Sequence, residues 1–121
     1  MGVAAVSTRS SEFRQALQDR IVIADGAMGT SLYSKGVFMN RCYDELNLST
    51  PTIVREVHEA YVKAGAQILE TNTFGANRLK LEKFGLSDRV RAINEAGARL
   101  AVDACRAAGA NIAGSVGPLS A

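Results

Sequence analysis

Polar and glycine-rich residues follow directly after three short apolar runs of the sequence. These polar segments are ADGAMGT (24–30), ETNTFGAN (70–77) and GSVGP (114–118). In parallel α/β folds, functional residues gather at the carboxyl ends of the strands. If the apolar runs are strands, their polar ends meet at one edge of a sheet, and we therefore predict a shared pocket there.

Asp25 ends the first apolar run, where an ionised carboxylate is costly unless it is paired. Two interpretations are open: the carboxylate binds a cationic group of a ligand, such as an ammonium, or it caps the following turn through backbone N–H groups. The small residues from Gly26 to Thr30 can offer backbone N–H groups to an anion. An amino acid, which carries an ammonium and a carboxylate, would suit both features. The glycine spacing does not match GxGxxG and no Walker lysine follows, so nucleotide binding is not supported.

Glu70 and Asn72 share one face of the second apolar run, because side chains alternate along a strand. A glutamate within such a strand either points into a polar cavity or is satisfied by a neighbouring element. The polarity continues through Asn72 and Thr73, which favours the pocket interpretation. Phe74 is expected to pack at the rim.

The elements that must position these residues are three strands separated by helices. The strands are predicted at 21–25, 67–72 and 111–117. Helices are predicted from Ser10 or Ser11 to Asp19, at about 30–35, from Pro51 to a stop at Gly65, at about 76–84, and at about 87–108. Apolar strands joined by helices indicate parallel pairing with right-handed crossovers. A doubly wound sheet and a (β/α)8 barrel both fit this order.

Composition narrows the class of protein. The chain has 121 residues and a net charge of +2, with basic residues spread along it, so nucleic-acid binding is not favoured. No apolar run approaches membrane-spanning length, and the N-terminus is a weak signal peptide, so we expect a cytoplasmic protein. Cys42 is interpreted as a free loop thiol and Cys105 as a core residue. His58, the only histidine, is expected at the surface of its helix or half-buried.

Four segments in order resemble the homocysteine S-methyltransferase domain. They are IVIADGAMGT, NRCYDELNLSTP, AGAQILETNTFGANRLKLEKFGL and AGSVGP, which together cover roughly residues 20–120. The second and third look closest to bacterial fusions with methylenetetrahydrofolate reductase, and the family also includes the N-terminal domain of methionine synthase. The resemblance implies an α/β fold that is the N-terminal part, about three β/α units, of a (β/α)8 TIM barrel. We expect residues 1–19 to form an N-terminal extension with a short helix and residues 20–121 to form a partial barrel that stops after the third strand.

The resemblance also implies roles for individual residues. Asp25 matches the aspartate that holds the homocysteine amino group. Gly26, Ala27 and Met28 match the loop whose backbone amides take the homocysteine carboxylate. Glu70, Asn72 and Thr73 match the family's second-strand motif, and the resemblance implies only that they line the pocket.

Family chemistry needs groups beyond these. A zinc ion held by three cysteines activates the homocysteine thiol, which then takes a methyl group to give methionine. Those cysteines lie on late barrel strands that Cys42 and Cys105 do not match, so no metal ligand is assigned here. The donor is a small molecule that the sequence does not identify: methylcobalamin, a methylated folate, S-methylmethionine and betaine are all used, and a reductase or a cobalamin or folate module can follow.

Three interpretations of the chain as a whole are open. We expect part of a homocysteine methyltransferase that is inactive in isolation. An inert fragment that acts at most as a binding or interaction module is the alternative. A different barrel or doubly wound enzyme is disfavoured, because four motifs occur in the family order.

Overall fold

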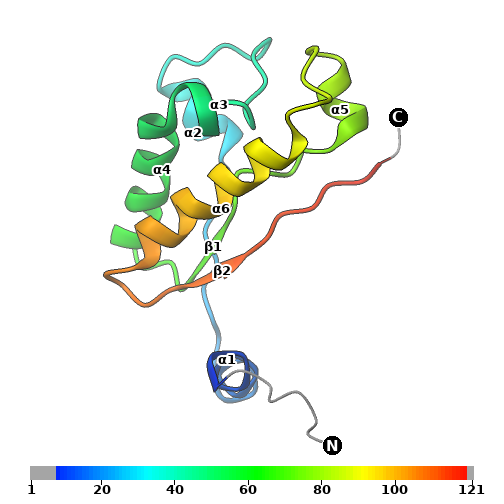
Figure 1. Cartoon of the computed structure of the whole chain (residues 1–121). Helices are drawn as coiled ribbons and strands as arrows, with labels where there is room; N and C mark the ends of the chain where they lie inside the picture. The colour runs from blue at the N-terminus through cyan, green and yellow to red at the C-terminus, as the bar shows by residue number, and fades with distance from the viewer. Residues whose placement is uncertain (1–7, 120–121) are drawn as a thin grey trace, which may run out of the picture.

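The computed structural model describes residues 8–119 and shows a mixed α/β fold with parallel strands (Figure 1). The elements, in chain order, are α1 (Thr8–Asp19), α2 (Gly29–Ser34), α3 (Leu46–Ser49), α4 (Pro51–Lys63), β1 (Ile68–Glu70), α5 (Arg78–Glu82), α6 (Val90–Cys105) and β2 (Asn111–Ala113). The two strands are separated by helices, as predicted, whereas among residues 8–119 no strand precedes α2, and the helices α2, α3 and α4 follow one another.

Three extended segments lie side by side and run in the same direction. Strand β1 pairs in parallel with β2, with Leu69 opposite Ile112. On the other side of β1, Ala24 forms a parallel bridge with Ile68. The parallel arrangement predicted for the sheet is confirmed, although the two named strands are shorter than predicted.

The first predicted strand, 21–25, is the main correction to the expected fold. Only Ala24 forms a bridge there, and Ile21 and Ile23 are 89% and 59% exposed. This segment lies at the edge of the sheet, and none of the described residues covers these two side chains. It is therefore extended but neither fully paired nor buried.

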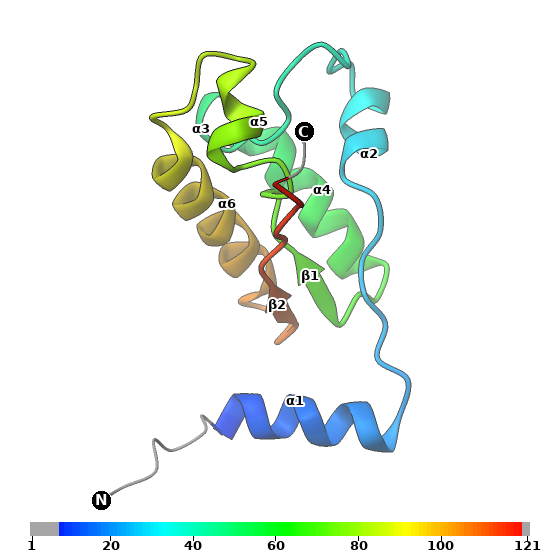
Figure 2. The ribbon, with the colours of Figure 1, turned by 90° about the vertical axis from the view of Figure 1, so that its right-hand side faces the viewer.

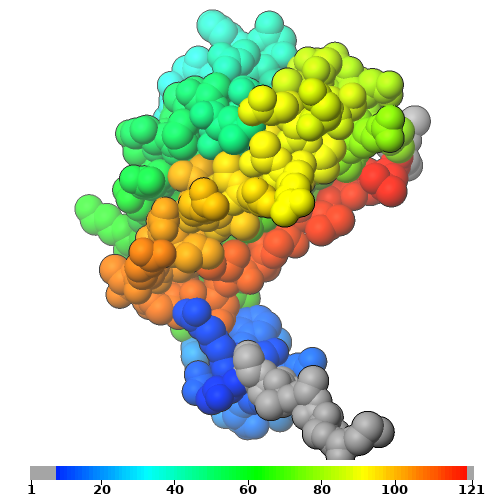
Figure 3. All heavy atoms as spheres, in the orientation of Figure 1, coloured from blue at the N-terminus to red at the C-terminus, as the bar shows by residue number. Residues whose placement is uncertain are grey.

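Helices α4 and α6 cover one side of the strands, and the other side faces the viewer in Figure 2. Helix α1 lies near the amino-terminal ends of the strands (Figure 1). In the space-filling view of Figure 3 it projects from the rest of the molecule. Residues on α2, α3, α4 and α6 form the largest buried cluster: Leu32, Leu46, Val54, Val57 and Leu100. This packing fixes the loops at the carboxyl ends of the strands.

Most predicted helices are present with shifted ends. Pro51 begins α4 after Thr50, as predicted, and the predicted stops Gly65 and Gly109 have φ of +106° and +67°, a backbone conformation that favours glycine. Helix α1 begins at Thr8 rather than at Ser10 or Ser11, and α6 is shorter than the predicted 87–108. The four-residue helix α3 was not predicted.

Two side chains are more buried than expected. His58 is 0% exposed, which makes the expected surface or half-buried position wrong. Cys42 is a free thiol in the loop before α3, as predicted, but it is buried in a hydrophobic cluster with Ala76, Leu81 and Ile93. Cys105 lies in the core with Leu69 and Ala110, as predicted.

Within the part of the chain that the structure describes, no helix is long and apolar enough to cross a membrane.

Candidate functional site

A cavity of ≈600 Å³ lies at the carboxyl ends of the three extended segments. We call it the site cavity. Its lining includes every residue that the sequence placed in a pocket: Asp25, Gly26, Ala27, Met28, Glu70, Asn72 and Thr73. Five further lining residues belong to the three polar segments that were predicted to meet there: Gly29, Thr71, Phe74, Gly75 and Ser115. Tyr43 and Asp44 come from a loop that was not assigned to the pocket. Among the described residues, the lining contains three carboxylates and no lysine or arginine, so its charge favours a cationic group.

Asp25 has one carboxylate oxygen in use and one without a partner. Its Oδ2 accepts a hydrogen bond of 3.0 Å from the backbone N–H of Glu70. Its Oδ1 is buried and has no partner among the described residues. Burial raises the pKa of Asp25 above its ordinary value, and the nearby charge of Glu70 adds to that rise. The backbone bond goes to a neighbouring strand rather than to the following turn, so the expected alternative of a turn cap is wrong.

The loop after Asp25 is held from outside the cavity. The Ala27 carbonyl accepts hydrogen bonds from the Tyr61 hydroxyl at 2.7 Å and from the Ser31 hydroxyl at 3.0 Å. No hydrogen bond among residues 8–119 uses the backbone N–H of Gly26, Ala27 or Met28. Three donors beside an acceptor with a free oxygen give the cavity both signs of partial charge.

Asn72 and Thr73 are buried, and their polar groups form hydrogen bonds with other residues of the protein. The Asn72 Nδ2 donates to the Tyr43 carbonyl at 2.9 Å and to Asn47 Oδ1 at 3.0 Å. Asn47 Nδ2 donates in return to the Asn72 carbonyl at 2.8 Å. The Thr73 hydroxyl donates to the Ser115 carbonyl at 2.8 Å. These two residues therefore shape the wall of the cavity.

Asp44 was missed by the sequence reasoning although it lines the cavity. Its Oδ1 accepts a 3.0 Å hydrogen bond from the Gly75 N–H, and burial raises its pKa. A Cβ at Gly75 would lie 2.8 Å from Asp44 Oδ2, so the glycine permits this approach. The loop segment CYDEL carried no local signal for this contact, because its partner lies 31 residues further along the chain.

Glu70 and Phe74 form the exposed part of the lining. Glu70 is exposed, whereas its strand neighbour Leu69 is fully buried. Phe74 is 57% exposed, and the Lys80 Nζ lies 5.6 Å from the centre of its ring. Phe74 thus lies at the rim as expected, but in contact with a lysine rather than packed away from solvent.

The described residues do not fit a zinc site of three cysteines. Cys42 and Cys105 lie in separate hydrophobic clusters, and neither lines the site cavity. Burial raises the pKa of both thiols, which opposes the thiolate form that binds metal. Between residues 8 and 119, no three His, Cys, Asp or Glu side chains gather where they could hold a metal ion.

Comparison with known proteins identifies the class. The family model for homocysteine S-methyltransferases matches residues 22–121. The chain belongs to this family. It is 34% identical over 91 residues to methionine synthase of Mycobacterium tuberculosis, which is 70% of this chain and 8% of that protein. It is 31% identical over 97 residues to methionine synthase of Mycobacterium leprae, 75% of this chain and 8% of that protein.

Solved structures match the fold over most of the chain. The metallated form of the homocysteine methyltransferase MmuM from Escherichia coli superimposes with a TM-score of 0.77 at 31% identity, covering 88% of this chain and 41% of that one. The apo form of the same enzyme gives a TM-score of 0.63. The chain thus spans less than half the length of the relatives that it matches.

Proposed function

We propose that this chain is the homocysteine-binding part of a homocysteine S-methyltransferase and contributes the first three β/α units of a (β/α)8 barrel. In this proposal residues 20–121 belong to the barrel and residues 1–19 are an extension. The parallel segments, with helices on one side, and the match to about two-fifths of MmuM support it.

The observation that carries the proposal is that, within residues 8–119, the Oδ1 of Asp25 and three backbone N–H groups beside it have no hydrogen-bond partner. The homocysteine ammonium binds Asp25, because a buried anion gains most from a cation that replaces lost water. The homocysteine carboxylate binds the N–H groups of Gly26, Ala27 and Met28. Two oppositely charged anchors fix the orientation of an amino acid as well as its position.

The remaining wall residues have supporting roles in this proposal. Asn72 and Thr73 hold the shape of the wall through the hydrogen bonds described above. Glu70 places a second carboxylate beside the ligand. In this proposal, residues outside this chain activate the thiol and select the methyl donor. The donor is a cobalamin, a folate or another small molecule. In the family a bound zinc ion lowers the pKa of the homocysteine thiol, and these residues do not provide its ligands.

A titration with L-homocysteine, followed by two-dimensional ¹H–¹⁵N spectra of the chain, tests the proposal. We expect the largest shifts at the amides of residues 26–28. Asp25→Ala should weaken binding about 30-fold or more, because it removes one partner of a buried charge pair. Asp88→Ala, at an exposed aspartate outside the cavity, is the matched control.

Two results would reject this function. The first is a wild-type chain that does not bind homocysteine, and the second is an Asp25→Ala variant with unchanged affinity. In a longer protein that carries these residues, Asp25→Ala should leave the zinc content unchanged, because Asp25 is not a metal ligand in the proposal.

A further inference from the structure

Tyr61 lies on α4, outside the site cavity, yet its hydroxyl reaches the loop that lines the cavity. It donates a 2.7 Å hydrogen bond to the carbonyl of Ala27, 34 residues away in the sequence. Ser31 on α2 donates to the same carbonyl at 3.0 Å. A carbonyl oxygen that accepts two hydroxyl donors is held in one direction.

That direction determines where the next backbone N–H points. In a planar trans peptide, the C=O of Ala27 and the N–H of Met28 point opposite ways. Tyr61 and Ser31 line a separate groove of ≈350 Å³ between α2 and α4, whereas Ala27 and Met28 line the site cavity. The carbonyl therefore faces the groove, and the Met28 N–H is turned toward the cavity.

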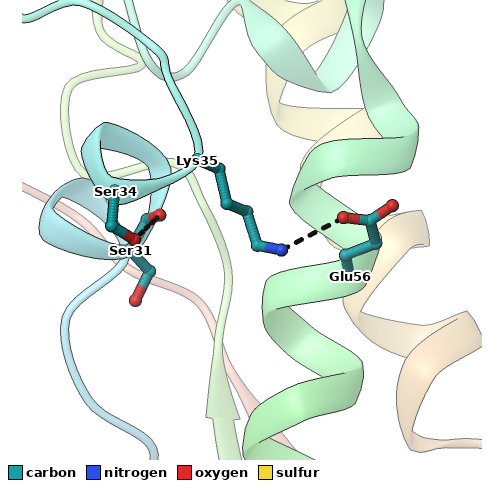
Figure 4. A network of polar contacts seen from close by, with 4 residues as sticks. All are labelled: Ser31, Ser34, Lys35 and Glu56. Carbon is teal, nitrogen blue, oxygen red and sulfur yellow. Dashed lines mark hydrogen bonds and ion pairs between the residues drawn. The ribbon is translucent and has the colours of Figure 1, made fainter.

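The surroundings of Tyr61 maintain this contact. A Cβ at Gly26 would lie only 3.0 Å from the Tyr61 hydroxyl, so the glycine leaves room for it. Lys35, at the end of α2, forms a 3.1 Å ion pair with Glu56 on α4 (Figure 4). This ion pair therefore joins α2 and α4 beside the groove that Lys35 lines together with Ser31 and Tyr61.

We infer that Tyr61 is a positioning residue for the ligand carboxylate: it holds the Ala27–Met28 peptide so that its N–H faces the bound amino acid. The inference rests on the proposed function, because it assigns how that binding loop is oriented. Loss of the hydroxyl leaves the Ala27 carbonyl to Ser31 alone and lets the peptide rotate. The effect must therefore depend on the carboxylate of the ligand.

The test compares two ligands on two tyrosine variants. One ligand is L-homocysteine and the other is 3-aminopropane-1-thiol, which is the same molecule without the carboxylate. Tyr61→Phe should weaken homocysteine binding about fivefold, the effect of one ordinary hydrogen bond, and leave binding of the aminothiol unchanged. Tyr33→Phe removes an exposed hydroxyl from α2 outside both cavities and should change neither affinity.

The carbonyl ¹³C shift of Ala27 gives a second readout in the free protein. It should move in Tyr61→Phe and stay in place in Tyr33→Phe. If Tyr61→Phe does not fold, Ser31→Ala removes the other donor to the same carbonyl and should show the same ligand dependence. Unchanged homocysteine affinity, or equal weakening of both ligands, overturns the positioning role alone. A wild-type chain that binds no homocysteine overturns the proposed function and this role with it.

Discussion

Asp25 and Glu70 are 45 residues apart in the sequence and are joined at the ends of two neighbouring extended segments, where the Glu70 N–H donates to Asp25 Oδ2 at 3.0 Å. This hydrogen bond orients the carboxylate, whose Oδ1 has no partner among the described residues. Burial of this carboxylate, which binds a cation in the proposed function, raises its pKa. In the proposed function the charge of Asp25 therefore favours binding of a cation, whereas burial of the same charge lowers the stability of the fold.

Asp25→Asn should raise the melting temperature and weaken homocysteine binding. Asparagine keeps an oxygen for the Glu70 N–H but removes a buried charge that Glu70 repels. Because the folded pKa of Asp25 is raised, this carboxyl group binds a proton more readily in the folded chain than in the unfolded chain as the pH falls towards that pKa. The contribution of Asp25 to stability thus increases in that acidic window, and the asparagine variant lacks this contribution. Thermal unfolding at several pH values checks both statements, and a variant less stable than wild type at neutral pH would contradict them.

Asn47→Ala should lower the free energy of unfolding by about 2 kcal/mol. Asn47 is 3% exposed, and its Nδ2 donates to the carbonyls of Asn72 and Ile93. Its removal leaves buried carbonyls without this donor. Urea denaturation measures the change, with Asn40→Ala at an exposed turn as the control. Equal midpoints for the two variants would show that the amide bridge contributes nothing.

His58 should make the chain less stable as the pH falls from about 6.5 to about 4. Burial lowers the pKa of His58 from 6.5 to about 4, and neither ring nitrogen has a partner among the described residues. The unfolded chain binds the proton more readily in this window, so the free energy of unfolding falls by up to about 3 kcal/mol as the pH decreases. His58→Leu should flatten this part of the profile. Parallel profiles for the two proteins would rule out the histidine as the cause.

Gly97→Ala should destabilise the chain by about 2 kcal/mol, although alanine is the better helix former. A Cβ on Gly97 would lie 2.7 Å from both Asn47 Nδ2 and Thr73 Cγ2. Gly114→Ala, where a Cβ would meet nothing within 4 Å, is the control and should be close to neutral. Chemical denaturation compares the two variants. A stabilised Gly97→Ala would mean that α6 does not pack as closely as described.

The two thiols should react slowly with Ellman's reagent at neutral pH until the chain unfolds. Cys42 and Cys105 are only 9% and 3% exposed, and burial raises both pKa values. Cys42→Ser and Cys105→Ser assign each rate, and we expect the Cys42 thiol to react first. Fast reaction of both thiols in the native chain would contradict the buried positions.

Local sequence patterns predicted the parts of the fold that depend on local physics. The apolar stripe of α6 was readable from Ile93, Leu100 and Cys105, which are all buried. His58 could have been placed inside, because it lies four residues after Val54 on the same face of α4. Ile23 was placed wrongly because an apolar run does not reveal whether a neighbour covers it.

The sequence also indicated the site cavity, because polar residues after parallel strands meet at one edge. It did not reveal Asp44 or Tyr61, whose contacts join residues 31 and 34 positions apart. The first contact joins the loop before α3 to the loop after β1, and the second joins α4 to the loop before α2, so neither has a periodic signal. The substrate roles of Asp25 and its neighbours are still predictions.

The amide of Asn47 has a mechanical consequence, because it holds Asn72 on the cavity wall and Ile93 on α6 at once. Helix α6 has 16 residues and is therefore about 24 Å long. Its far end packs through Cys105 against Leu69, below the cavity. Helix α6 thus connects Leu69 on β1 to the cavity-wall residue Asn72, and a displacement of the helix would move both.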